Sequence, residues 1–105
     1  MTTELTAADS GRTVTVHVGD VVSVRLPESP TTGYRWQPDI DTTRLRAAED
    51  RYEPAQPQAR GGGGERVLGF EVLQAGTTAL RLAERRSWES GPASTEFSVQ
   101  LDVQG

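Results

Sequence analysis

The sequence contains no cysteine, no lysine and only one histidine, His17. Without cysteine, a disulfide framework, a thiolate metal site and a cysteine nucleophile are all excluded. A Ser-His-Asp catalytic arrangement would have to use His17, which lies mid-strand between two valines and reads as a surface histidine. The carboxylates are scattered and lack the spacing of an oxygen cage for a metal. The sequence therefore predicts a protein that is not an enzyme and needs no metal or cofactor.

Charge and hydrophobicity limit the partners. Fifteen acidic and eleven basic residues give a formal charge of -4, whereas binding to nucleic acid requires a basic face. No apolar run is long enough to span a membrane, and residues 1–10 lack the basic start and apolar stretch of a secretory signal. We expect no nucleic-acid or membrane partner. The cytoplasm is the default location, and a secreted or periplasmic location stays open if the chain was truncated.

Apolar and polar residues alternate along several short stretches, as in strands with one buried face. About seven to eight such strands, with turn signals between them, predict an all-β fold: an immunoglobulin-like β-sandwich of mostly antiparallel strands. The apolar positions are Val14, Val16 and Val18; Val22, Val24 and Leu26; Leu68, Phe70 and Val72; Leu80 and Leu82; and Phe97, Val99, Leu101 and Val103.

Other segments give more local expectations. Gly19-Asp20 is a turn dipeptide that predicts either a hairpin or a corner between two sheets, and Ala75-Gly76 predicts a tight turn. We interpret residues 42–45 as irregular and residues 46–52 as a strand. Trp36 is expected in the core, on a central strand, like the buried tryptophan of many immunoglobulin-type sandwiches.

The first of three distinctive loops is Ser-Pro-Thr-Thr-Gly-Tyr, residues 29–34. Pro30 fixes its own φ and favours an extended residue before it, while Gly33 can take a positive φ. Thr31 and Thr32 are thereby presented on a pre-shaped bend. The alternative is an ordinary turn whose threonines only cap backbone groups.

The other two loops differ in chemistry. The four glycines at 61–64 either allow close backbone approach to an extended segment or form a plain flexible connection. The tract is not a phosphate cradle, because no Lys-Ser/Thr follows it. The third loop, residues 85–92, contains Arg86 and Trp88, residue types that dominate binding hot spots. Trp88 either lies exposed at the loop tip or folds back as a lid on the sandwich.

Together, in this order, the three loops resemble those of the chagasin-like inhibitors of papain-family cysteine peptidases, and the resemblance extends from about Asp20 to Val103. It implies one inhibitor domain over residues 1–105 and a monomer. It also implies reversible, tight binding in which loops 29–34, 60–65 and 85–92 occlude the peptidase's active-site cleft, without a cofactor. The implied peptidase-binding residues are Ser29, Pro30, Thr31, Thr32, Gly33, Tyr34, Gly61, Gly62, Gly63, Gly64, Arg86, Ser87 and Trp88.

Two positions depart from the family pattern. The family usually has asparagine where this chain has Ser29, and it has Arg-Pro-Trp where this chain has Ser87 between Arg86 and Trp88. These departures leave open a family member that has lost inhibitory activity. A further alternative is an immunoglobulin-like adhesion or carbohydrate-binding module, since sandwich folds carry many unrelated functions.

Overall fold

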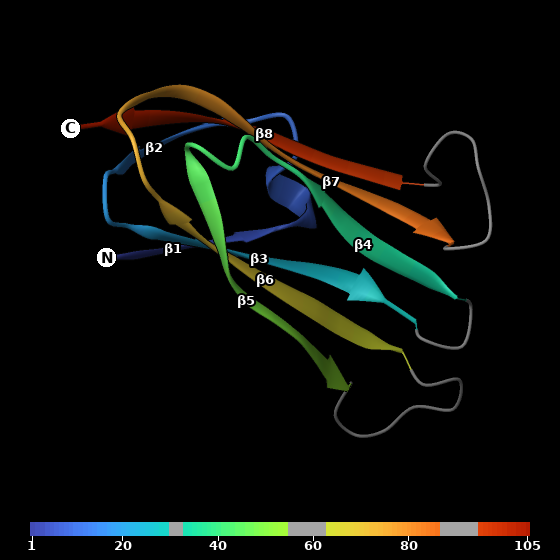
Figure 1. Ribbon diagram of the computed structural model, residues 1–105. Coiled ribbons are helices and arrows are strands. Elements are labelled where there is room, and N and C mark those ends of the chain that lie inside the picture. Colours follow the sequence, from blue (N-terminus) through green and yellow to red (C-terminus); the bar gives the residue numbers. More distant parts are fainter. Residues whose placement is uncertain (30–32, 55–62, 87–94) are drawn as a thin grey trace.

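Two four-stranded sheets pack face to face in the computed structural model, which describes residues 1–29, 33–54, 63–86 and 95–105 (Figure 1). A short 3-10 helix, η1, follows the first strand. In chain order the elements are β1 (Thr2–Thr6), η1 (Ala7–Asp9), β2 (Thr13–His17), β3 (Val21–Glu28), β4 (Tyr34–Asp39), β5 (Leu45–Pro54), β6 (Gly64–Val72), β7 (Gly76–Arg86) and β8 (Thr95–Gln104).

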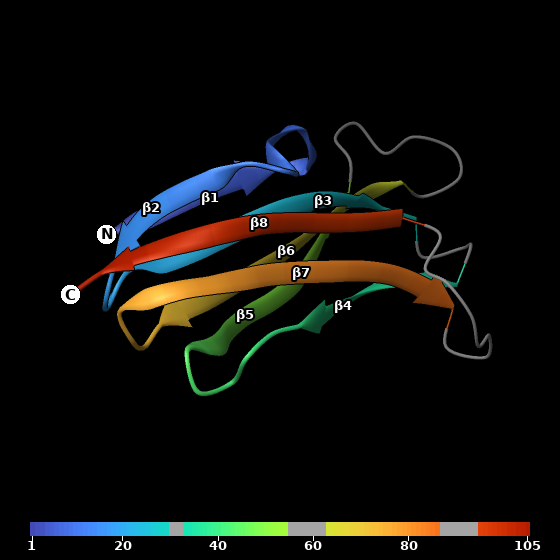
Figure 2. The ribbon, with the colours of Figure 1, turned by 90° about the horizontal axis from the view of Figure 1, so that it is seen from above.

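The first sheet has the strand order β1-β3-β6-β5, and the second has the order β2-β8-β7-β4. The pairs β1–β3 and β2–β8 are parallel, and the other four pairs are antiparallel. Viewed from above, the two sheets form two layers (Figure 2). The predicted fold class, an all-β sandwich of mostly antiparallel strands, is confirmed.

The alternating apolar positions meet between the two sheets. The fully buried side chains include Phe70 from the first sheet and Phe97 from the second, surrounded by leucines and valines of both. The prediction from alternation holds along β3, β6, β7 and β8. It fails at Val18, which follows the end of β2 and is 44% exposed, so the buried series of that strand stops at Val16.

Gly19-Asp20 forms a corner between the sheets, because β2 belongs to the second sheet and β3 to the first. Gly19 has a φ of 91°, and its N–H donates to the carbonyl of Val72 over 2.9 Å. The carboxylate of Asp20 accepts from the backbone N–H of His17 at 3.0 Å, which closes the corner. The side chain of His17 is exposed, as the sequence predicts.

The strand predicted at 46–52 is also present, as the longer β5. Residues 42–44 form the turn that precedes it, closed by hydrogen bonds from the backbone N–H groups of Arg44 and Leu45 to the carbonyl of Asp41, both 3.0 Å. Leu45 itself is not irregular: it starts β5 and is fully buried. The strand therefore begins one residue before the predicted boundary, with the side chain of Leu45 in the core.

Turn carboxylates should make the protein sensitive to acid. Hydrogen bonds from the backbone N–H groups of Thr6 and His17 lower the pKa of Asp9 and Asp20, respectively, and the Thr43 side chain lowers that of Asp41. A carboxyl with a lower pKa in the folded state contributes stability above its unfolded pKa, ordinarily 3.8, and loses it as the pH falls through the folded value.

We therefore expect the free energy of unfolding to decline as the pH drops below about 4. Urea unfolding curves between pH 2 and pH 6 measure this decline. The variant Asp20→Asn should decline less steeply with acid than the parent protein. Equal acid slopes for the two proteins would show that the corner at Asp20 contributes nothing to the pH dependence.

Candidate functional site

The strands that bound the three predicted loops end together at one end of the sandwich, away from the two chain termini (Figure 1). In the first sheet, Gly64 pairs with both Glu28 and Pro54, so the flanks of the first and second loops are neighbours. In the second sheet, Tyr34 pairs with Arg86, so the flanks of the first and third loops are neighbours. We call this end of the molecule the loop end.

The structure describes about half of the predicted binding residues. Those at the loop end are Ser29, Gly33, Tyr34, Gly63, Gly64 and Arg86. Those that lie outside the described residues are Pro30, Thr31, Thr32, Gly61, Gly62, Ser87 and Trp88.

A buried carboxylate fixes the base of the first loop. The side chain of Glu28, the last residue of β3, has no exposed surface. One of its oxygens accepts from Nη2 and Nε of Arg66, at 2.7 and 3.1 Å, and the other accepts from the backbone N–H of Trp36 at 3.2 Å. Glu28 therefore joins the first sheet to the second across the loop end.

The partner of this carboxylate is well held. Arg66 on β6 also donates to Asp50 at 3.1 Å, and its guanidinium lies 5.9 Å from the centre of the Tyr52 ring. The hydrogen bond to Glu28 raises the pKa of Arg66 above its usual range, so the arginine stays charged. The sequence carries no signal for the pairing of Glu28 with Arg66, because the two residues lie 38 positions apart in the chain.

Trp36 is buried, as predicted, with 7% of its surface exposed. Its indole N–H donates to the carbonyl of Pro27 at 2.9 Å, a second link between β4 and the end of β3. The prediction of a central strand is wrong: β4 is the last strand of the second sheet. Trp36 is buried because it points between the sheets, not because neighbouring strands flank it on both sides.

Gly33 has a φ of 81°, which confirms that the first loop needs a residue able to adopt a positive φ at this position. Directly after it, the ring of Tyr34 lies under the guanidinium of Arg86, 4.4 Å from the ring centre. This cation–π stack joins the end of the first loop to the start of the third. The sequence carries no signal for it, because the pairing of β4 with β7 decides it.

The two described glycines of the second loop differ. A Cβ at Gly63 would meet open space, whereas a Cβ at Gly64 would collide with the carbonyl oxygen of Glu53 and the phenol of Tyr52. Gly64 is therefore required by the packing of the loop end, and Gly63 is open to contact from outside. The sequence does not distinguish these two glycines, because their surroundings depend on strand packing.

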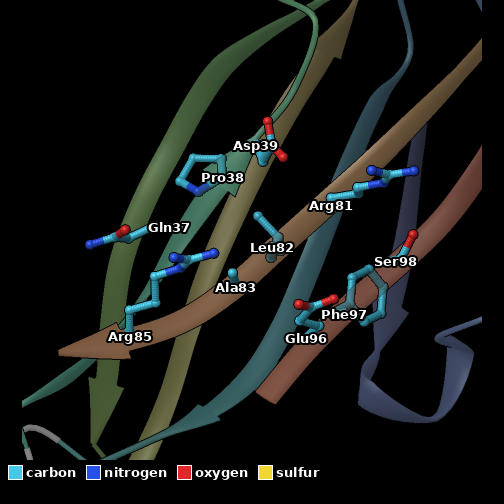
Figure 3. Close-up of a pocket in the computed structure, with 10 residues that line it drawn as sticks. All are labelled: Gln37, Pro38, Asp39, Arg81, Leu82, Ala83, Arg85, Glu96, Phe97 and Ser98. Carbon is cyan, nitrogen blue, oxygen red and sulfur yellow. The ribbon is translucent and has the colours of Figure 1, made fainter. Parts of the chain in front are cut away.

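A hollow of about 380 Å³ lies between the bases of the first and second loops. Its lining comes from the ends of β3, β4, β6 and β7 and comprises Pro27, Glu28, Ser29, Tyr34, Gly63, Gly64 and Glu84. A larger hollow of about 600 Å³ lies on β4, β7 and β8, where Ala83 sits between Arg81 and Arg85 (Figure 3). Asp39 and Glu96 also line it, so this second hollow carries charges of both signs.

Within the part of the chain that the structure describes, no three or more histidines or carboxylates are grouped so as to hold a metal ion. Nor does that part contain a helix with the length and apolar character needed to cross a membrane.

Residues 15–103, nearly the whole sandwich, match the model of one protein family. That family is the chagasin family of peptidase inhibitors, I42. The chain belongs to the chagasin family. Chagasin from Trypanosoma cruzi is 35% identical over 108 residues, which cover 96% of this chain and 97% of chagasin. The chain is thus a chagasin-family cysteine peptidase inhibitor and not an enzyme, as its sequence predicts.

Solved structures show the same fold. EhICP2, a cysteine protease inhibitor from Entamoeba histolytica, superposes with a TM-score of 0.87 at 23% identity, covering 98% of this chain and 95% of its own. PbICP-C, whose structure is a complex with falcipain-2, superposes with a TM-score of 0.66 at 14% identity, covering 99% and 92%. This chain therefore shares its β-sandwich fold with both solved structures.

The Glu28 network should matter to stability. Glu28→Gln keeps the side-chain shape but removes the buried charge that pairs with Arg66 and leaves the arginine only the exposed carboxylate of Asp50, so we expect a loss of about 3 kcal/mol in the free energy of unfolding. For a domain of this size that corresponds to a melting temperature lower by roughly 12–20 °C. The matched control Glu96→Gln, on an exposed glutamate of β8, should change stability by less than about 0.5 kcal/mol. Equal effects of the two changes would contradict the assigned role of Glu28.

The two glycines offer a second matched pair. Gly64→Ala forces a methyl group against backbone and should cost about 1–3 kcal/mol of unfolding free energy. Gly63→Ala meets no atom and should stay within about 0.5 kcal/mol of the parent. Thermal unfolding followed by circular dichroism measures both. A Gly64→Ala protein as stable as the parent would mean that Tyr52 and the backbone at Glu53 both move aside without cost.

Proposed function

We propose that the protein inhibits papain-family cysteine peptidases reversibly and tightly, by occluding the active-site cleft with loops 29–34, 60–65 and 85–92. The observation that carries this proposal is the common position of the strand ends that bound all three loops. One cleft can receive three loops only if they leave the scaffold side by side. The complex of PbICP-C with falcipain-2 supports a peptidase as the partner.

A peptidase of this family can cleave only a chain that lies in its cleft in a suitable conformation. Such an enzyme acts on an extended strand that lies along its cleft in one direction. Three separate loops fill the cleft without offering that strand. The first loop is also braced at both flanks, by the buried carboxylate of Glu28 and by Trp36, so it resists the distortion that acylation requires.

Rigid flanks also favour tight binding. Loops that are already shaped lose little conformational entropy on docking, so an interface of standard size, about 1,600 Å², can reach high affinity. The strand pairing reaches Glu28 and Tyr34 at the first loop, Pro54 and Gly64 around the second, and Arg86 and Thr95 around the third. The scaffold therefore holds the positions at which the loops start and end.

We assign roles to the three loops from the family resemblance. Thr31 and Thr32 lie at the catalytic thiol and imidazole of the peptidase, Gly62 and Gly63 along one arm of the cleft, and Trp88 on the other. Arg86 accompanies Trp88 on that arm. The protein acts as a monomer and needs no cofactor.

Titration of papain and of a cathepsin L-like enzyme with the pure protein tests the proposal. We expect stoichiometric loss of activity, competitive with substrate. Undiminished activity of several such enzymes would instead indicate a family member that has lost inhibition, for which Ser29 and Ser87 are the suspected causes, or an adhesion or carbohydrate-binding module.

The third loop should contribute strongly to affinity. Trp88→Ala should raise the inhibition constant by about thirtyfold, the effect of losing a hot spot of about 2 kcal/mol. The melting temperature should stay nearly unchanged, because we place Trp88 outside the core. Unfolding of the Trp88→Ala protein would show that Trp88 belongs to the core and would overturn the assignment of this residue.

A further inference from the structure

The stack of Arg86 on Tyr34 joins two loops that are far apart in the sequence. Tyr34 is the first residue of β4 and follows the first loop, while Arg86 is the last residue of β7 and precedes the third loop. The two residues face each other in the register of β4 and β7, at the last pair of that ladder. With the guanidinium 4.4 Å from the ring centre, the stack closes the ladder on the loop side.

We propose that Tyr34 and Arg86 are positioning residues whose stack couples the first and third loops, so that both enter the peptidase as one preformed surface. The inference rests on the proposed function. It changes the role that the sequence suggested for Arg86, which acts through Tyr34 on the first loop instead of only touching the peptidase. It also gives Tyr34 a role beside the binding threonines.

The position of β4 explains why such a coupling is needed. As the last strand of the second sheet, β4 is held within that sheet by β7 alone among the described strands. The backbone at the start of β4 is held by its ladder pairing with β7 and by Trp36, two residues further on, through Glu28 and Pro27. The stack fixes Tyr34 itself, next to the positive-φ residue that ends the loop.

The stack also completes a continuous path around the loop end. Arg66, at the start of β6 after the second loop, binds Glu28, which ends β3 before the first loop. Glu28 binds the backbone of Trp36 on β4, and Tyr34 on the same strand carries Arg86 of β7. The flanks of all three loops are therefore connected by side-chain contacts, with the first loop in the middle.

The chemistry of arginine makes the coupling specific. A planar guanidinium stacks on an aromatic ring, whereas a lysine ammonium keeps the charge but lacks the plane. Loss of the stack leaves both loops less ordered before docking, and the ordering cost then appears in the inhibition constant. The size of a partly exposed cation–π contact predicts an effect of roughly fivefold to tenfold.

A double-mutant cycle tests the proposal, with inhibition of papain as the readout. Arg86→Ala and Tyr34→Leu should each raise the inhibition constant by roughly fivefold to tenfold. The inhibition constant of the double variant should be no higher than that of the more damaging single variant. Tyr34→Phe, which keeps the ring, should inhibit better than Tyr34→Leu, and Arg86→Lys, which loses the planar stack, should inhibit less well than the parent protein. The control Arg81→Ala, on the same strand, should leave the inhibition constant unchanged. Circular dichroism checks that each variant is folded.

Two results would overturn the coupling. Multiplicative effects in the double variant would show that Arg86 and Tyr34 touch the peptidase independently. Full inhibition by Arg86→Lys would show that only the positive charge matters.

A readout on the free protein separates this inference from the proposed function. If the parent protein inhibits no papain-like enzyme, the proposed function fails. The coupling is then judged from the amide NMR resonance of Gly33 in Arg86→Ala and that of Thr95 in Tyr34→Leu. Both should shift relative to the parent spectrum, while Arg81→Ala should leave Gly33 in place. Unchanged resonances in both variants would refute the coupling.

Discussion

The buried carboxylate of Glu28 is the constraint on which the loop end depends. A charge without exposed surface is costly unless it is paired and hydrogen-bonded, and here the required partners come from both sheets. Arg66 on β6 and the backbone of Trp36 on β4 must therefore stay where they are for the fold to be stable. The same requirement fixes the spacing of the strands from which the first and second loops emerge.

The loop end differs in chemistry from the rest of the sandwich. Most of the interior is apolar and rests on dispersion and the hydrophobic effect, centred on residues such as Phe70 and Phe97. At the loop end, the ion pair of buried Glu28 with Arg66, its hydrogen bonds and two arginine–tyrosine cation–π contacts add to this apolar packing. Directional interactions hold backbone positions more specifically than apolar packing does, so they fix the strand ends that bound the three loops.

The outer face of the first sheet is covered by ion pairs. Arginines and glutamates pair across its strands, as in Arg25 with Glu53 and Glu65, and Arg46 with Glu71. Such exposed pairs add little to stability, but they leave a charged, self-paired surface, and β5 also has a bulge between Ala47 and Glu49. Charge and irregularity discourage edge-to-edge pairing of strands.

Most of the strands and buried faces, the positive φ at Gly33 and the family follow from the sequence alone, whereas β1 carried no signal and Val18 and Leu45 were misplaced. Period-two alternation and turn chemistry are local properties, and the loop motifs are legible one at a time. The three-dimensional arrangement was needed to show that β4 is an edge strand, that Gly64 but not Gly63 must lack a side chain, and that Arg86 stacks on Tyr34. Alternation tells which face a residue occupies but not which strand lies beside it. The pairs that shape the loop end form between strands that the chain visits far apart, so sheet order alone brings them together.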